Sequence, residues 1–327
     1  MVDLDGKRIL ITGGTGSFGN ALIDYLGDID TLFIVFSRDE KKQHDMYISR
    51  RDDRIKYVIG DIRDKQKLIY SMKDVDYVFH AAALKHVPTG ENFPEEVIET
   101  NILGTKNVIE AAEYCGIKKV ISLSTDKAVY PINAYGMSKA LAEKIISSHN
   151  GETTCVTLRY GNVLGSRGSV VPLFINFIYQ NKPITITNPK MTRFLLTLNE
   201  AVKLSLKCLN SGDKGDLFVI KSPACNIKTL VDALELHFGK KFEKKIIGIR
   251  PGEKIDETLL TSDEVHRSVI EKENGTTYAK IPHLGNDIGD YFLTGDEHIE
   301  PEPFTSSNTK QYDAKRTLDK IKEAGLI

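Results

Sequence analysis

Short apolar runs alternate with stretches of helical periodicity over the first half of the chain. Stretches such as 17–26 and 100–115 repeat apolar residues at the spacing of an amphipathic helix. The apolar runs between them have the length and continuity of strands buried on both faces of a sheet, and they fall at 8–12, 31–36, 57–59, 77–79 and 120–123. Regular alternation of this kind predicts an α/β fold built on a doubly wound parallel sheet.

The pattern becomes less regular in the second half. Turns that contain glycine, proline or asparagine interrupt it at 165–168, 188–189 and 222–223. One more helix is predicted at 198–209 and one more strand at 217–220. We therefore expect a second, smaller unit made from separate pieces of the chain.

These changes divide the chain into a large domain, a smaller discontinuous α/β lobe and a polar C-terminal segment. The segment carries glycine and proline and ends in a predicted helix at 314–324. The predicted boundaries are 1–165 plus 192–222 for the domain, 166–191 plus 223–283 for the lobe, and 284–327 for the segment.

The composition excludes several classes of protein. The 327 residues carry a net charge of −1, so no basic field points to nucleic acid. The four cysteines show no CxxC spacing and the eight histidines no HxxxH or HxH pattern, so we expect reduced thiols and no metal site. The chain enters a strand directly and has no apolar run near the ~20 residues that cross a bilayer. We therefore expect a cytoplasmic protein with no signal peptide and no membrane partner.

A glycine-rich loop joins the first predicted strand to the first predicted helix. Its sequence, TGGTGSFG at 12–19, satisfies GxGxxG and also GxxGxxG. Such glycines allow a tight turn and a close approach of backbone to a pyrophosphate, while the helix N-terminus supplies N–H groups. A purely structural turn is the competing interpretation, but strand, loop and helix fall where a Rossmann-type dinucleotide site requires them. The predicted contacts are Gly13, Thr15, Gly16, Ser17, Phe18 and Gly19.

The end of the second strand predicts which dinucleotide binds. A site for NAD usually places a carboxylate there for the ribose 2′-hydroxyl. In this chain Ser37 and Arg38 come first, with Lys41 and Lys42 behind them. A hydroxyl and a guanidinium suit the 2′-phosphate of NADP. Asp39, a carboxylate one residue later than usual, leaves NAD as the alternative cofactor. The competing interpretation of Arg38 is a solvated surface charge.

Two later strand ends complete the predicted cofactor site. Asp61 and Ile62 follow the third strand and would flank the adenine. Ala81, Ala82 and Ala83 follow the fourth strand, where small side chains would let the backbone pass close to the cofactor.

Two acid–base pairs lie close together in the sequence. Tyr135 and Lys139 are four residues apart on a predicted helix, so their side chains share one face. Free tyrosine has a pKa near ~10, and a nearby ammonium and an oxidised nicotinamide would both lower it, so that the phenolate could take a hydroxyl proton. Asp126 and Lys127 form the second pair, beside Thr125. The competing interpretations are packing on a helix surface for the first pair and an exposed ion pair for the second.

These motifs together resemble those of a known family. The chain resembles the extended short-chain dehydrogenases/reductases that act on nucleotide sugars. Among these it is most similar to the bacterial UDP-N-acetylglucosamine 4,6-dehydratases, including those that invert C5. The matching segments are 13–19, 36–42, 80–88, 124–139, 160–163, 166–170, 191–194 and 250–254.

The resemblance implies a role for each residue of the two pairs. Tyr135 would be the redox base at the C4 hydroxyl, with Lys139 lowering its pKa and holding the nicotinamide ribose. Thr125 would hydrogen-bond the C4 oxygen. Lys127 would take the C5 proton as a neutral amine, which requires a pKa well below the usual ~10.4. Asp126 would protonate the departing C6 hydroxyl.

It also implies contacts with the rest of both ligands. Lys85 would lie near cofactor and sugar. Arg167 and Arg250 would bind the diphosphate of UDP, and Glu253 its ribose. Further cofactor contacts would be Leu123, Ser124 and Val163, and further substrate contacts Asn162, Ser169, Val170 and Thr187.

The triplet Thr125-Asp126-Lys127 favours C5 inversion among the related reactions. Dehydratases that retain configuration carry Thr-Asp-Glu at this point, and the 4-epimerases carry small residues. The substrate would be UDP-N-acetylglucosamine and the product UDP-2-acetamido-2,6-dideoxy-L-arabino-hexos-4-ulose, for surface glycan synthesis. A 4-epimerase of UDP-glucose or UDP-N-acetylglucosamine is the alternative. A non-catalytic dinucleotide sensor or scaffold is the third hypothesis.

The resemblance further implies self-association. It points to a homo-oligomer such as a hexamer, and to a C-terminal latch near 306–309 that touches a neighbouring subunit. A loosely packed polar tail is the competing interpretation of that latch.

Overall fold

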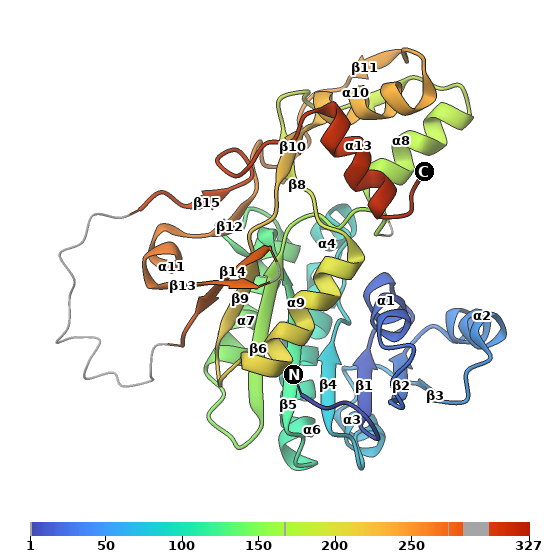
Figure 1. The fold of residues 1–327 in the computed structure, drawn as a ribbon. Helices are drawn as coiled ribbons and strands as arrows, with labels where there is room; N and C mark the ends of the chain where they lie inside the picture. Colours follow the sequence, from blue (N-terminus) through green and yellow to red (C-terminus); the bar gives the residue numbers. More distant parts are fainter. Residues whose placement is uncertain (1, 167, 274, 284–300) are drawn as a thin grey trace.

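A central sheet organises the computed structural model, which describes residues 2–166, 168–273, 275–283 and 301–327 (Figure 1). Its strands are β1 (Arg8–Thr12), β2 (Leu32–Ser37), β3 (Ile55–Ile59), β4 (Tyr77–His80), β5 (Lys119–Thr125), β6 (Thr154–Tyr160), β9 (Leu217–Ile220), β13 (Val269–Glu273) and β14 (Thr276–Ile281). They lie in the order β13-β14-β9-β6-β5-β4-β1-β2-β3. The strands from β9 to β3 pair in parallel, and β14 and β13 add antiparallel at one edge.

Successive residues of a strand point to opposite sides of the sheet, and here both sides carry apolar side chains. Helices therefore cover both faces. Ile9 and Ile11 of β1 share a core with α1 (Ser17–Tyr25) and α9 (Leu198–Ser211). Leu10, between them, packs into a second core with α3 (Lys65–Ser71) and α6 (Gly104–Tyr114). The remaining helices of this part are α2 (Glu40–Arg50), α4 (Val87–Asn92), α5 (Pro94–Val97) and α7 (Ala134–Ser147).

The strand order reverses between β1 and β4. From β1 the chain runs outward to β2 and β3, and it then returns to the other side of β1 to begin β4. In open α/β sheets the crevice outside the carboxyl ends of the strands at such a reversal is where ligands bind. The loops that follow β1, β4 and β5 meet at this crevice.

A smaller lobe stands over the crevice, at the top of Figure 1. Its elements are α8 (Val170–Tyr179), β7 (Ile184–Ile186), α10 (Ile227–Phe238), β11 (Lys244–Ile246) and α13 (Ala314–Glu323). They enclose a separate core that includes Phe174, Leu234 and Ile321. An antiparallel pair of short strands, β8 (Thr192–Phe194) and β10 (Ala224–Asn226), carries the chain into the lobe.

The predicted fold class, a Rossmann-type α/β fold on a parallel sheet, is confirmed. Three strands of the central sheet, β6, β13 and β14, are not among the predicted ones, and the last two join that sheet although 223–283 were assigned to the lobe. The division of the chain into domains stays a prediction. Within the described ranges, no helix combines the length and the apolar character needed to span a membrane.

The C-terminal segment packs on its own chain wherever it is described. The strand β15 (Phe304–Thr305) pairs antiparallel with β12 (Thr258–Leu260), next to the helix α11 (Ser262–Arg267). The helix α13 packs along α10. Residues 284–300 of this segment lie outside the described residues. A latch on a neighbouring subunit stays a prediction.

Candidate active site

A cavity of about 990 Å³ lies between the carboxyl ends of the parallel strands and the smaller lobe. It is lined by the loops after β1, β2, β4, β5 and β6, and from the other side by α8, α10 and the segment around 250–253. Nearly all of the predicted site residues line this one cavity. The exceptions are Gly19 and Lys41, and Arg167 lies outside the described residues.

The glycine loop after β1 forms one end of the cavity. Gly13 has a φ of 66°, and a Cβ there would stand 2.9 Å from the backbone of Ala82. A Cβ on Gly16 would lie 3.0 Å from the carbonyl oxygen of Gly13. Both glycines line the cavity with Thr15, and Ser17 and Phe18 begin α1 beside them. The loop therefore exposes bare backbone and a helix N-terminus, as the pyrophosphate of a dinucleotide requires.

Gly19 serves the packing of this loop. A Cβ at Gly19 would lie 2.2 Å from the carbonyl oxygen of Gly14. The third glycine of the motif thus lets α1 pack closely against the loop, which is its usual role in dinucleotide folds.

The end of β2 carries the groups that would meet the adenosine ribose. The Ser37 hydroxyl lies 3.0 Å from that of Thr15. Arg38 is half-exposed, and its guanidinium lies 3.6 Å from the carboxylate of Asp61. Both charged groups line the cavity with Ile62. A guanidinium at this position fits a 2′-phosphate.

Asp39 is engaged in capping α2. Its carboxylate accepts a hydrogen bond of 3.0 Å from the backbone N–H of Lys42 and also pairs with the Lys42 ammonium. Lys41 turns to solvent and pairs with Asp45 at 2.6 Å. Of the two predicted lysines, Lys42 therefore lines the cavity and Lys41 does not.

The wall after β4 consists of Ala81, Ala82 and Ala83 with Lys85, and their contacts with a cofactor stay a prediction. Asn101 fixes this loop by accepting from the backbone N–H of Leu84 and donating to its carbonyl oxygen, at 2.8 and 2.9 Å. Asn101 lies in a π-helical turn, Ile98–Leu103. The same turn brings Thr100 to the cavity, and its buried hydroxyl has no hydrogen-bond partner among the described residues. Thr100 was not predicted as a site residue, since a π-helical turn has no simple periodicity in the sequence.

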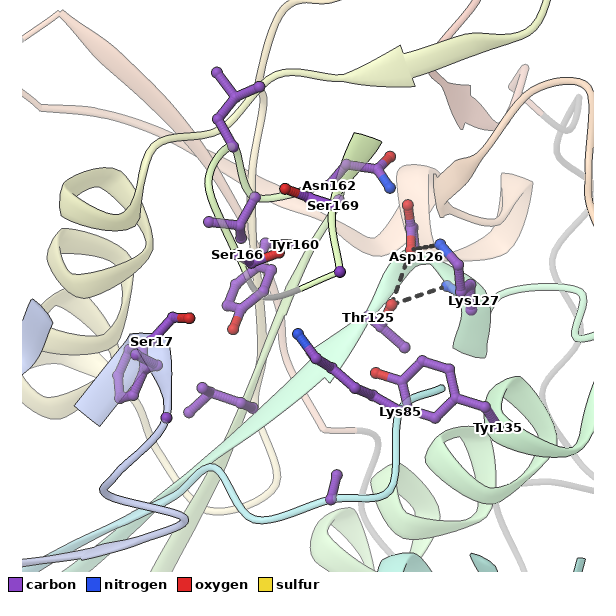
Figure 2. Close-up of a pocket in the computed structure, with 18 of the residues that line it drawn as sticks. Ser17, Lys85, Thr125, Asp126, Lys127, Tyr135, Tyr160, Asn162, Ser166 and Ser169 are labelled. Atoms are coloured by element: carbon purple, nitrogen blue, oxygen red, sulfur yellow. Dashed lines mark hydrogen bonds and ion pairs between the residues drawn. The ribbon is translucent and has the colours of Figure 1, made fainter. Parts of the chain in front are cut away.

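The reaction centre lies at the end of β5 (Figure 2). The Thr125 hydroxyl donates to Oδ1 of Asp126 at 2.8 Å, and the Lys127 ammonium donates to the same oxygen at 3.1 Å. Asp126 is 1% exposed. Tyr135 and Lys139 on α7 line the same part of the cavity. The two acid–base pairs of the sequence thus come together around one space, and neither is a surface feature.

Burial sets the pKa of both groups on α7. It raises the pKa of Tyr135 to about 12, against the charge of Lys127 and a hydrogen bond with Thr125, which lower it. It lowers the pKa of Lys139 to about 8, against the charge of Glu143, which raises it. Lys139 therefore loses its proton far more easily than a lysine in water.

Lys127 behaves in the opposite way. Burial disfavours its charge, but the carboxylates of Asp126 and Glu257 outweigh burial, so the pKa of Lys127 is raised. The resting site thus holds Lys127 as an ammonium, whereas the sequence interpretation required a neutral amine. That expectation omitted Glu257, which lies 3.2 Å from the Lys127 ammonium.

Glu257 was not predicted as a site residue. It is 3% exposed, and its Oε1 lies 3.7 Å from Nε of Arg193 as well as near Lys127. Burial and the charge of Asp126 raise its pKa. The only sequence signal is its place a few residues after the matching segment 250–254.

The lobe side of the cavity holds the predicted substrate contacts. Oδ1 of Asn162 and Oγ of Ser169 are buried without a hydrogen-bond partner among the described residues. Arg250 and Glu253 pair with each other at 3.3 Å. Val170 and Thr187 lie on the same side, and Leu123, Ser124 and Val163 line the cavity floor. Apolar residues not predicted from the sequence close the lobe end: Leu173, Phe174, Ile186, Ile227 and Leu230.

No group of three or more histidine, cysteine, aspartate or glutamate side chains is placed to hold a metal ion in the part of the chain that the structure describes. The donors that the cavity offers are backbone N–H groups, hydroxyls, ammonium groups and guanidinium groups. These suit phosphates and sugar hydroxyls.

Comparison with known proteins places the chain in a family. Residues 9–278 match the family described as "Polysaccharide biosynthesis protein". A protein of Rickettsia bellii (strain OSU 85-389) named UDP-glucose 4-epimerase is 50% identical over 97% of this chain and 94% of its own length. The X-ray structure of Pen from Bacillus thuringiensis superposes with a TM-score of 0.86, at 34% identity, over 98% of this chain and 100% of that one.

A more distant structure shares the fold. DesIV from Streptomyces venezuelae, a dTDP-glucose 4,6-dehydratase solved with NAD and TYD bound, has a TM-score of 0.70 at 21% identity, over 76% of this chain and 86% of that one. The chain belongs to the polysaccharide biosynthesis protein family of extended short-chain dehydrogenases/reductases, and it is an enzyme of the nucleotide-sugar dehydratase and epimerase type.

Proposed function

We propose that this enzyme is an NADP-dependent UDP-N-acetylglucosamine 4,6-dehydratase that inverts C5. The observation that carries the proposal is the buried pair of Asp126 and Lys127, which lines the cavity beside Tyr135. A 4-epimerase acts at C4 alone and needs no second acid–base pair there. A buried ion pair also carries a desolvation penalty, so it is retained more readily where it has a chemical use.

The residues divide the reaction between them. The chemistry that NADP supplies when bound is reversible hydride transfer. Tyr135 would take the proton of the C4 hydroxyl as a phenolate, the form that the positive charge of a bound oxidised nicotinamide would favour. C4 becomes a ketone, and the ketone acidifies the C5 proton. Thr125 hydrogen-bonds both Tyr135 and Asp126, so the proton gained by the phenol can reach Asp126 through the Thr125 hydroxyl. Asp126 then protonates the departing C6 hydroxyl, which leaves as water.

Lys127 takes the C5 proton in the same step. The electron pair of the C5–H bond forms a double bond to C6 as the C6–O bond breaks. Once bound NADP has supplied hydride to C6, C5 would take a proton from solvent on the face opposite the one that lost it, which would give the L-arabino 4-keto-6-deoxy sugar. Such a product would serve surface glycan synthesis in the cytoplasm.

The nucleotide would occupy the lobe side of the cavity. The unpartnered buried oxygens of Asn162 and Ser169 are available to a ligand there. Arg250, now paired with Glu253, would turn to the diphosphate and leave the carboxylate to the ribose. Arg167, which lies outside the described residues, is proposed as the second diphosphate ligand.

A UDP-sugar 4-epimerase is the second candidate. The name of the Rickettsia relative, at 50% identity, favours it over the dehydratase. It would use Tyr135, Lys139 and Thr125 as above and leave Asp126 and Lys127 without a chemical step.

Turnover of UDP-N-acetylglucosamine in deuterated water, followed by NMR of the product, separates the two reactions. The dehydratase gives a 4-keto-6-deoxy sugar with solvent deuterium at C5, because the abstracted proton is replaced from solvent. The epimerase gives the C4 epimer with no deuterium at C5. That second result would refute the dehydratase.

The choice of NADP rests on Arg38 at the end of β2 and on the engagement of Asp39 as a helix cap. We expect Arg38→Ala to weaken NADP binding by roughly 10-fold to 100-fold, since a charge-assisted bond to phosphate is worth about 1.5–3 kcal/mol. NAD binding should change less than threefold. Titration of both dinucleotides by fluorescence measures this, with Lys41→Ala as the matched control because Lys41 points away from the cavity. Equal losses for both dinucleotides would overturn the assignment.

A further inference from the structure

Glu257 stands directly behind Lys127 and is not among the residues that line the cavity. Its Oε1 lies 3.2 Å from the Lys127 ammonium, while Oδ1 of Asp126 lies 3.1 Å from the same nitrogen. The side chains of Glu257 and Asp126 are 4% and 1% exposed, and that of Lys127 is 25% exposed. The lysine therefore sits between two buried carboxylates, one facing the sugar site and one behind it.

The backbone of Glu257 is fixed by the C-terminal segment. Its N–H donates to Oγ of Ser306 and its carbonyl oxygen accepts from the Ser306 N–H, both at 2.8 Å. The Ser306 hydroxyl in turn lies 2.6 Å from that of Thr192 on β8. Ser306 is fully buried. The folded-back segment thus places the Glu257 carboxylate against Lys127 from outside the cavity.

The charges that face Glu257 come from several elements. Asp126 and Lys127 lie at the end of β5, Arg193 is on β8, and Lys254 is on the segment of Glu257 itself. Oε2 of Glu257 and Oδ2 of Asp126 are buried without hydrogen-bond partners in the described structure. Two nearby carboxylates with free oxygens share one ammonium, and burial raises the pKa of Glu257. Such a carboxylate accepts a proton more readily than one in water.

We propose that Glu257 is a positioning residue that takes the proton of the Lys127 ammonium, so that a neutral amine faces the C5 proton. This inference rests on the proposed dehydratase function. One N–H bond of the ammonium breaks and one O–H bond forms on Oε1 of Glu257. The freed electron pair of Nζ then takes the C5 proton. When Lys127 passes that proton to solvent, the proton on Glu257 returns to the amine, and the pair ends the turnover as it began.

The transfer resolves the conflict between the ammonium form of the resting Lys127 and its use as a base. Because the proton moves inside the pair, the wild-type elimination needs no net loss of a proton to solvent. Its rate should therefore change little over about pH 7–9, a range in which a base of the usual lysine pKa near ~10.4 would gain activity with pH.

The test compares Glu257→Gln with wild type, using UDP-N-acetylglucosamine and bound NADP. Glutamine keeps the shape of the side chain but cannot take a proton from an ammonium. We expect elimination at neutral pH to fall by roughly 10²-fold to 10³-fold, the usual range for loss of a proton-transfer partner. The remaining rate should rise up to tenfold per pH unit, because Lys127 must now lose its proton to solvent. C4 oxidation should persist, visible as more absorbance of reduced nicotinamide than in wild type.

Two further variants separate this role from a structural one. Glu235→Gln is the matched control, because Glu235 is a buried glutamate on α10 that pairs with Lys241 and Lys244, away from the cavity. It should keep the wild-type rate and pH profile. Glu257→Asp keeps the carboxylate and should keep the flat pH profile at a reduced rate, so it serves as the test if Glu257→Gln does not fold.

The outcomes distinguish this inference from the proposed function. A wild-type enzyme that makes only the C4 epimer overturns the dehydratase and the role of Glu257 with it. A wild-type enzyme that dehydrates, with Glu257→Gln at the same rate and pH profile, overturns the role of Glu257 alone. A steep pH profile for Glu257→Asp also overturns it.

Discussion

Two lysines of this enzyme face the same cavity from neighbouring elements. Lys139 on α7 is buried and forms no ion pair with a carboxylate of the described residues, since Glu143 pairs with Arg159 instead, and burial lowers the pKa of Lys139 to about 8. Lys127 at the end of β5 lies between the carboxylates of Asp126 and Glu257, which raise its pKa in spite of burial. Residue type and burial alone therefore do not determine the pKa of a lysine. The carboxylates in contact with it decide whether its pKa is raised or lowered.

The difference divides the chemistry between the two regions. The region of α7 holds Tyr135, which is a phenol in the resting site, and Lys139, whose ammonium loses its proton more easily than one in water. The region of β5 holds charges of both signs and oxygens without partners, which suits transfer of a proton between carbon and oxygen. Substitutions that remove one lysine at a time test whether the two regions are separate.

Lys127→Met should have the largest effect. Elimination should fall by roughly 10²-fold to 10⁴-fold, since a general base is lost, while C4 oxidation by the Tyr135 region continues. The folded state should also lose about 3 kcal/mol at pH 7, because Asp126 and Glu257 are left as buried carboxylates without their common cation. Product analysis by NMR and urea unfolding of the ligand-free enzyme measure the two effects.

The stability that Lys127 contributes depends on pH. The folded pKa of Lys127 is above its unfolded value, so its contribution to stability is complete at neutral pH and is lost only as pH rises through the folded pKa. A Lys127→Met enzyme with unchanged unfolding at pH 7 would show that the ion pairs contribute nothing. Loss of C4 oxidation in this variant would break the separation of the two regions.

The sequence predicts these two regions unequally. Tyr135 and Lys139 are four residues apart, and Asp126 follows the strand β5, so local spacing alone finds them. Glu257 lies 130 residues from Lys127 and reaches it only through the fold, as does Ser306, which holds Glu257. The charge of Lys127 depends on that distant contact, so its pKa could not be judged from the sequence.

The fold shows the same limit. The strands β1 to β5 each contain an apolar run and were predicted from it, although β3 is only partly buried. The strand β6 contains Arg159, whose guanidinium is buried because Glu143 and Glu264 pair with it, and a charged residue interrupts the apolar pattern. The edge strand β13 is largely exposed and reads as polar. The strand β6 therefore depends on partners far away in the sequence, whereas β13 pairs with β14, which follows it directly along the chain.

Lys139→Met should change the stability less than or as much as Lys127→Met, and in the opposite direction. The substitution removes a buried ammonium that pairs with no carboxylate in the described part of the chain, so the ligand-free enzyme should gain up to about 3 kcal/mol at pH 7, the value of a pKa lowered from 10.5 to about 8. The wild-type free energy of unfolding should rise between about pH 8 and 10.5, because over this range the unfolded chain binds the proton that the folded chain has lost. The difference between wild type and Lys139→Met should shrink over the same range. Urea unfolding at several pH values measures it, and an equal loss of stability in both methionine variants would contradict the comparison of the two lysines.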